Sequence, residues 1–198
     1  MPILAKEIDC YPEDLFEWQN LGCETDRIWW ALYTMARHEK ELMRKLVPLG
    51  IPFYGPVIPK RTRSPGGRVR ESHVPLFPGY VFIYGDHSQR YDALTTNCVS
   101  RYLPVADGVQ LTEQLRQFRR LIEMGVPLTP EERLQPGDLV RVRRGRLAGI
   151  EGVVVRREGR TRLLVAVDFL RRGATLVLED CDFEVIGYKS FESCRSKS

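Results

Sequence analysis

The sequence has few of the residues on which most enzymes and secreted proteins depend. It contains three histidines and five cysteines, and the cysteines are scattered without a C-x-x-C pair: Cys10, Cys23, Cys98, Cys181 and Cys194. An odd number of widely spaced cysteines argues against a disulfide framework and against a zinc site. No Ser-His-Asp pattern and no pair of carboxylates in a pocket-like context is present. The sequence therefore predicts a protein that is not an enzyme and uses no cofactor or metal.

Long apolar runs are missing as well. No segment approaches the roughly 18 apolar residues that cross a bilayer, and the N-terminal stretch has no apolar core of signal-peptide length. Hydrophobic residues still make up 43% of the 198 residues, which is enough for a folded core. We therefore expect a soluble, cytoplasmic monomer that does not bind membranes.

Acidic and basic residues are segregated along the chain. Residues 1–27 hold seven acids against two cations, whereas residues 141–162 hold eight arginines against two glutamates. A third zone, from Lys60 to His73, is also basic. Such segregation suggests contact with a polyanion near the basic zones, and a solvated basic face without a partner is the alternative.

The pattern of residues 28–125 predicts an α+β fold in which a ferredoxin-like sheet is layered with helices. Strands are expected at 29–35, 80–84 and 100–105, an extended edge at 52–59, and a hairpin with its tip at 64–67. Helices are expected from Arg37 to about Val47, after Ser88 as an N-cap, and from Thr112 as an N-cap to Gly125.

The C-terminal third has the pattern of a very small barrel. Apolar and charged residues alternate from Leu139 to Arg143, a glycine-bearing turn follows, and a β-branched run begins after Gly152. Five short strands are expected, near 138–144, 150–157, 162–169, 174–179 and 182–186. The predicted domains are an acidic N-terminal extension at 1–27, a main domain at 28–125, a linker at 126–135, a barrel domain at 136–187 and a tail at 188–198.

Two signatures make the chain resemble a known family. The stretch Pro75-Leu-Phe-Pro-Gly-Tyr-Val-Phe82 is similar to the Phe-Pro-Gly-Tyr signature of the NusG amino-terminal (NGN) domain, and a strand bearing Trp29 and Trp30 precedes it. The later Pro-Gly-Asp…Gly-Val-Val pattern resembles a KOW motif, which implies an SH3-like five-stranded β-barrel. The resemblance covers about residues 28–187.

The resemblance implies a bacterial transcription elongation or antitermination factor. In this family the NGN domain docks on the clamp helices of the RNA polymerase largest subunit and favours the closed, processive state. The KOW domain recruits a small-subunit ribosomal protein or the termination factor Rho. A ribosome-associated RNA-binding KOW protein, using the arginines of residues 141–162, is the alternative from another class.

The resemblance also implies contact residues. Tyr33, Phe77, Pro78 and Tyr80 would form the floor of an aromatic-lined hollow for the polymerase, with plain core packing as the alternative. Core packing is the expectation for Phe82 and Trp30. The residues expected to meet DNA share a positive charge or a polar tip, and they are Arg37, His38, Lys40, Arg44 and Lys45 on a helix, Arg61, Arg63, Arg68 and Arg70 on the hairpin, and Asn97 near the non-template strand.

In the KOW part, Gly152 resembles a family glycine at which close backbone approach excludes a side chain, and Gly137 and Gly145 are expected in turns. Phe169 and Leu170 match the edge that relatives use for partner binding, and barrel closure is the alternative. The stretches 74–78 and 95–102 favour a specialised paralogue of the RfaH type. The β-rich residues 174–186 instead predict stable strands that do not refold into helices.

Overall fold

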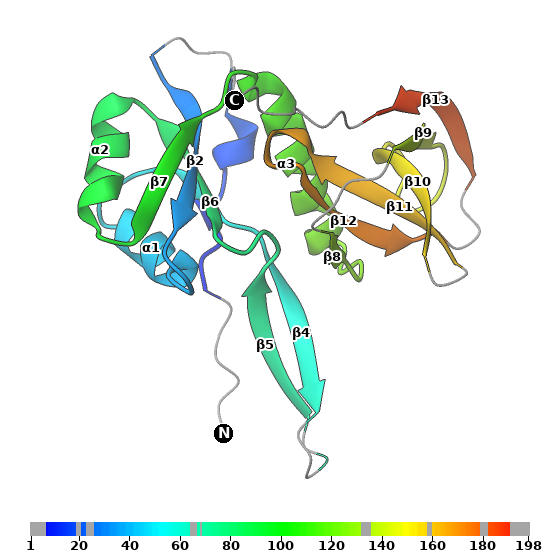
Figure 1. Ribbon diagram of the computed structural model, residues 1–198, viewed down its shortest axis with the longest axis horizontal. Helices are drawn as coiled ribbons and strands as arrows, with labels where there is room; N and C mark the ends of the chain where they lie inside the picture. Colours follow the sequence, from blue (N-terminus) through cyan, green and yellow to red (C-terminus); the bar gives the residue numbers. More distant parts are fainter. Residues whose placement is uncertain are drawn as a thin grey trace, which may run out of the picture. The chain divides into compact units, whose positions relative to one another are not determined.

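A computed structural model of the chain describes residues 7–18, 21–22, 26–63, 67, 69–131, 136–157, 160–178 and 182–190. The chain divides into two compact units, residues 1–113 and residues 114–198. α-Helices stand beside antiparallel sheets, which confirms the α+β class (Figure 1). The division falls inside helix α3 (Gly108–Glu123), ahead of the linker expected at 126–135, and the predicted domain boundaries stay a prediction.

The first unit is built on a five-stranded sheet in the order β1-β3-β6-β2-β7, with all neighbours antiparallel. Its strands are β1 (Cys10–Tyr11), β3 (Phe53–Tyr54), β6 (Tyr80–Gly85), β2 (Ile28–Thr34) and β7 (Val99–Pro104). The expectation of an edge at 52–59 is wrong for β3, because strand β1 of the N-terminal extension pairs on its outer side.

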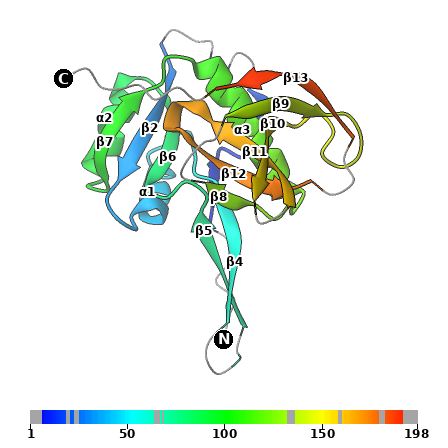
Figure 2. The same cartoon turned by 45° about the vertical axis from the view of Figure 1, so that its right-hand side comes forward.

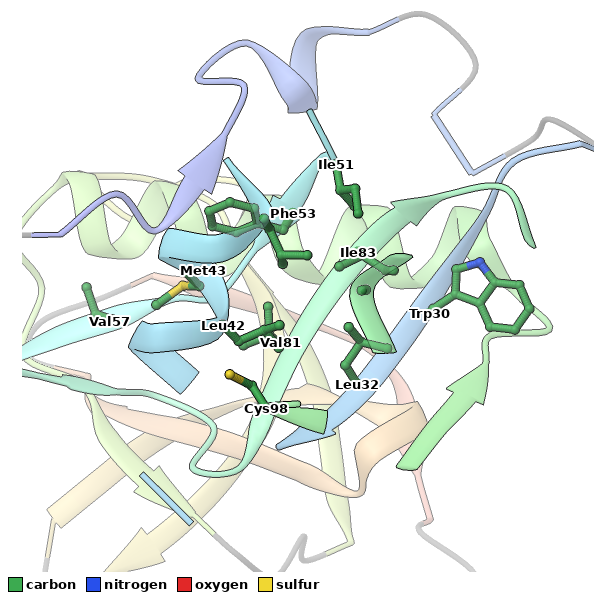
Figure 3. Packing of buried hydrophobic residues seen from close by; sticks show 12 residues of the cluster. Trp30, Leu32, Leu42, Met43, Ile51, Phe53, Val57, Val81, Ile83 and Cys98 are labelled. Atoms are coloured by element: carbon green, nitrogen blue, oxygen red, sulfur yellow. The ribbon is translucent and has the colours of Figure 1, made fainter. Parts of the chain in front are cut away.

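Helix α1 (Glu39–Leu46) covers this sheet with an apolar stripe. Leu42 and Met43 are buried and pack in one cluster with Phe53, Val81 and Ile83 of the sheet (Figure 3). Leu46 is also buried, four residues after Leu42 and three after Met43, so one face of the helix lies against the core. Trp30 and Phe82 are 3% and 0% exposed, which confirms that both are core residues.

Helix α2 (His87–Thr95) begins two residues earlier than the sequence suggests. The Asp86 carboxylate accepts from the Gln89 backbone N–H at 2.8 Å, and Gln89 Oε1 accepts from the Asp86 N–H at 3.3 Å. This reciprocal pair is a capping box. The N-cap is therefore Asp86, and the expectation of Ser88 is wrong.

Helix α3 also begins before its expected cap. Its first turn follows Asp107, whose carboxylate accepts from the Gln110 N–H at 2.8 Å. Thr112 lies inside the helix, where its hydroxyl donates to the Gly108 carbonyl at 2.7 Å and accepts from Trp29 Nε1 at 2.9 Å. A threonine hydroxyl can bond either a backbone N–H at a helix N-terminus or a carbonyl one turn earlier in the helix. Thr112 does the second, so the expectation that it is the N-cap of α3 is wrong.

The described part of the N-terminal extension packs on the first unit. Leu15 and Phe16 of the short helix η1 (Leu15–Glu17) are 0% and 7% exposed. The Phe16 ring stacks on Trp29 at 6.2 Å and meets Tyr54 edge-on at 5.0 Å between centroids. The described part of the extension thus belongs to the folded unit, with the Phe16 ring packed against Trp29 and Tyr54.

A two-stranded hairpin, β4 (Val57–Arg63) and β5 (Val69–Pro75), extends away from the five-stranded sheet in both views (Figures 1 and 2). Residues from Pro59 to Arg63 are exposed, whereas Val57 and Ile58 at its base are buried. The hairpin therefore presents its basic arm to solvent.

The second unit holds a six-stranded antiparallel sheet in the order β13-β9-β10-β11-β12-β8. The strands are β8 (Thr129–Glu131), β9 (Gly137–Val142), β10 (Glu151–Arg157), β11 (Arg160–Val167), β12 (Arg172–Val177) and β13 (Phe183–Lys189). All five expected strands are present, and β8 adds a sixth inside the expected linker. Among the described residues no pairing joins β13 to β8, so the sheet is not shown to close into a barrel.

Three glycines of the second unit are expected to have structural roles, and the structure gives each of them a different one. Gly145 lies in the β9–β10 connection with φ +87°, as expected for a turn. A Cβ on Gly152 would lie 2.6 Å from the Leu164 carbonyl oxygen, which fits the expected close approach. Gly137 is not a turn residue, because it is the first residue of β9 and a Cβ there would lie 2.9 Å from Val153.

Within the described residues, no helix is both long and apolar enough to span a membrane.

Candidate functional site

The Phe77–Tyr80 segment forms a tight turn at the start of β6. The Tyr80 N–H donates to the Phe77 carbonyl at 3.0 Å, and Gly79 at the third position has φ +83°. Proline second and a left-handed glycine third define a type II turn. The Pro-Gly pair of the sequence signature is therefore explained by backbone geometry.

Two further contacts fix this turn to its surroundings. The Gly79 N–H donates to the Glu39 carboxylate at 2.7 Å, and the Gly79 carbonyl accepts from the Thr34 N–H at 2.8 Å. A Cβ on Gly79 would lie 3.1 Å from the Tyr33 ring, so the turn runs directly against that ring. The turn is thus held by α1 on one side and by β2 on the other.

Tyr33 and Tyr80 lie opposite each other on β2 and β6. Their rings meet edge-to-face at 5.2 Å between centroids, and both side chains are partly exposed. The Arg101 guanidinium lies 4.7 Å from the centre of the Tyr33 ring. The pair presents apolar ring surface with polar tips, which suits a contact that excludes water.

Phe77 does not belong to this surface. Its side chain is 1% exposed, and its ring lies edge-on to Phe82 at 6.3 Å. The expectation that Phe77 contacts a partner conflicts with this burial, because the turn directs Phe77 into the core and leaves Pro78 exposed. Tyr33, Pro78 and Tyr80 are the three expected contact residues that reach the surface.

The cations of helix α1 lie beside acidic groups. Glu7 of the N-terminal extension lies 4.0 Å from Lys40 Nζ and 3.7 Å from Arg44 Nη1. Arg37 is not on the helix, because its φ of +65° places it in the preceding left-handed turn. His38 precedes the helix at its N-cap and lies 3.8 Å from Glu41.

Lys45 has the shortest of these ion pairs, at 2.8 Å from Glu41 one turn earlier. The hydrogen bond between them lowers the pKa of Glu41 and raises the pKa of Lys45 from their ordinary values. Lys45 also donates to the Thr96 carbonyl at 3.0 Å. Its ammonium group is therefore occupied within the domain, and Lys40 and Arg44 are the cations better placed for a partner.

The hairpin cations are exposed. Arg61 pairs with Glu71 across the strands at 3.0 Å, and Lys60 and Arg63 form no ion pair with another described residue. Arg68 lies outside the described residues, and Arg70 is placed only as a backbone position in β5. Asn97 is exposed after α2 with φ +58°.

Residues 27–120 match the family model of NusG, described as transcription termination factor nusG. The chain carries a NusG-family domain. A search of curated proteins found no match. The matched residues include the Pro78–Gly79 turn, both tyrosines and helix α1. The match thus links residues 27–120, rather than the whole chain, to a family described as a transcription termination factor.

Beyond the NusG-family domain, Phe169 and Leu170 lie on the short helix η2 (Asp168–Leu170), where Phe169 is 38% exposed. Asp168 is held from two sides: Gln114 Nε2 donates to its carboxylate at 2.8 Å, and Lys189 Nζ does so at 2.6 Å. The Asp168 N–H in turn donates to Gln114 Oε1 at 3.1 Å. Sequence reasoning missed Gln114, because no local pattern marks a glutamine that bonds a residue so distant along the chain.

Three arginines of the second unit, Arg141, Arg143 and Arg144, lie beside acids. Arg141 lies 2.7 Å from Glu151 and 3.8 Å from Glu184, and Arg143 lies 3.7 Å from Glu184. The hydrogen bond that Arg141 donates to Glu151 raises the pKa of Arg141 from its ordinary value. Arg144 lies 3.9 Å from Asp182. This part of the basic stretch therefore carries less available charge than its composition implies.

Proposed function

We propose that this chain is a transcription elongation or antitermination factor whose NusG-family domain binds the clamp helices of the RNA polymerase largest subunit. The observation that carries the proposal is the type II turn at Pro78–Gly79, which holds Tyr33 and Tyr80 as a partly exposed ring pair. A rigid aromatic pair loses little conformational entropy on binding and supplies the kind of anchor that dominates interfaces.

The proposed activity is differential binding. A factor that binds the closed clamp more tightly than the opened clamp shifts the population toward the closed state by that difference in affinity. The paused polymerase is thereby disfavoured without any covalent step. The antiparallel order β3-β6-β2-β7, with helices α1 and α2 between its strands in the chain, supports an NGN-type ferredoxin-like domain.

Helix α1 and the hairpin would contact DNA beside the polymerase. Lys40, Arg44 and Arg63 are exposed or partly exposed cations that can meet phosphates without reading bases. Asn97 would reach the non-template strand from the end of α2. Because these are phosphate contacts, the DNA affinity would fall steeply with salt.

The second unit would act as a KOW domain that recruits a small-subunit ribosomal protein or Rho through Phe169 and Leu170. Its support is the exposed Phe169 ring on a loop that Gln114 and Lys189 hold in place. The alternative, an RNA-binding KOW protein, is not favoured, since Arg141, Arg143 and Arg144 already lie beside carboxylates. The specialised RfaH-type paralogue remains our proposal, and the strands β12 and β13 support a second unit that stays β-structured.

The test is co-purification of purified variants with core RNA polymerase. Tyr80→Ala removes one ring of the pair and should weaken binding by about 2 kcal/mol or more, roughly 30-fold. Tyr91→Ala on helix α2 is the matched control, because Tyr91 is 63% exposed and lies outside the ring pair. Equal retention of wild type, Tyr80→Ala and Tyr91→Ala would show that the polymerase is bound elsewhere or not at all.

A further inference from the structure

The N-terminal extension supplies a carboxylate to the face of α1 proposed for DNA. Glu7 lies between Lys40 and Arg44, with its two carboxylate oxygens 4.0 Å and 3.7 Å from their nitrogens. Residues four apart on a helix project from the same face. One acidic group therefore occupies the position that a phosphate would take between these two cations.

The extension is anchored close to this point. Cys10 and Tyr11 pair with Tyr54 and Phe53 in the sheet, and the Asp9 carbonyl accepts from the Gly55 N–H at 2.7 Å. The Tyr11 ring also stacks on Phe53 at 6.2 Å. Glu7 lies two residues before this backbone anchor, so its carboxylate stays near α1 whether or not it touches the cations.

The contact itself is loose enough to be displaced. Both distances are ion-pair distances longer than a hydrogen bond, and Glu7 Oε2 is buried without a hydrogen-bond partner among the described residues. The side chain of Glu7 as a whole is 29% exposed, and those of Lys40 and Arg44 are 34% and 65% exposed, and ion pairs that solvent reaches contribute little to stability. The two acids of α1 itself have other partners: Glu41 lies beside Lys45 and His38, and Glu39 accepts from the Gly79 N–H.

We propose that Glu7 is a built-in competitor of nucleic acid, which masks Lys40 and Arg44 until a phosphate backbone displaces it. The inference rests on the proposed contact between helix α1 and DNA, and it says that Glu7 regulates that contact. Binding of DNA would then release Glu7 from the two cations, and the affinity measured for the free protein would include the cost of that release. Removing the Glu7 charge should strengthen binding without adding any new contact.

The experiment measures fluorescence anisotropy of a labelled DNA duplex of about 20 base pairs at salt from about 50 to about 200 mM. Glu7→Gln in the full chain should tighten binding about threefold at low salt and steepen the logarithmic salt dependence by up to about 0.9 for each cation unmasked. Glu17→Gln is the matched control, because Glu17 is an exposed acid of the same extension with no ion pair to a described residue. It makes the same change in net charge and should alter binding by less than about 1.5-fold.

The double variant Lys40→Gln with Arg44→Gln separates two kinds of failure. If it weakens DNA binding but Glu7→Gln behaves like Glu17→Gln, the masking role is wrong and the DNA contact of α1 stands. If the double variant binds DNA as wild type does, the proposed DNA contact of α1 is wrong. If masking is right, Glu7→Gln has no effect in the double-variant background.

Discussion

Two regions of this protein are rich in cations, and they differ in how their charge is compensated. In the second unit, Arg141 lies between carboxylates of the two neighbouring strands, at 2.7 Å from Glu151 and 3.8 Å from Glu184. In the NusG-family domain, Lys40 and Arg44 share the single carboxylate of Glu7. Arg141, Arg143 and Arg144 thus lie beside three carboxylates, whereas Lys40 and Arg44 share one.

Strand register explains the difference. Arg141 on β9 lies directly opposite Glu151 on β10 and opposite Glu184 on β13. Opposite charges at directly facing positions stabilise a sheet, so the register produces compensation on both sides of one arginine. A helix face or a hairpin arm has no such partner strand on its outer side. Charge counted along the sequence therefore overstates the positive charge that Arg141 and Arg143 leave available to a partner.

The largest expected effect comes from a substitution at Gly152, which should disturb the strand register that places Arg141 opposite its two acidic partners. Because a Cβ there would lie 2.6 Å from the Leu164 carbonyl oxygen, Gly152→Ala should destabilise the second unit by about 2–3 kcal/mol. The measurement is urea unfolding followed by far-UV circular dichroism and by tryptophan fluorescence. Trp18, Trp29 and Trp30 all lie in the first unit, so their fluorescence transition should not move while a circular dichroism transition shifts to lower urea.

Gly187→Ala is the control for this substitution. No heavy atom lies within 4 Å of a Cβ at Gly187, so the change should stay within about 0.5 kcal/mol. If the two variants unfold alike, the close approach at Gly152 does not set the stability of the sheet.

The hairpin and the second unit can be compared directly with two double variants, each of which removes two positive charges. Lys60→Gln with Arg63→Gln removes two exposed hairpin cations that have no ion pair with a described residue. At about 100 mM salt this should weaken DNA duplex binding about tenfold and lower the salt dependence by about 0.9 for each cation. Arg143→Gln with Arg144→Gln should change binding by less than about twofold, since both arginines already lie near acids.

Anisotropy titrations of the two double variants against wild type test this prediction. Equal losses would mean that cations with and without acidic partners contribute alike to DNA binding, and the comparison drawn from the ion pairs would be wrong.

The elements of the fold follow largely from local patterns in the sequence. The spacing of Leu42, Met43 and Leu46 indicates one buried helix face. The β-forming residues from Trp29 to Met35 indicate a central strand, which the structure has at Ile28–Thr34. Local patterns fail where a side chain has two compatible roles. Thr112 has the chemistry of a cap but bonds Gly108 within the helix, and no nearby residue distinguishes the two.

The sequence predicts where the candidate site lies in the chain, but not which of its side chains reach the surface or which partners they have. The Pro-Gly pair predicts the turn, yet only the folded turn shows that Phe77 points into the core while Tyr80 stays at the surface. The partners of Arg141 and Lys40 depend on contacts between segments far apart along the chain. Strand register and the path of the N-terminal extension fix those contacts, and neither has a local sequence signal.

The smallest predicted effect comes from unmasking the compensated sheet. Glu151→Gln with Glu184→Gln removes the carboxylates that lie beside Arg141 and Arg143, so both arginines should become available to phosphates. We expect DNA affinity to rise about twofold to threefold and the salt dependence to steepen. Glu17→Gln with Asp138→Asn makes the same change in net charge at exposed acids without ion pairs to described residues. If this control raises affinity as much, net charge alone governs binding, and the local pairing of arginines with acids does not decide which surface meets DNA.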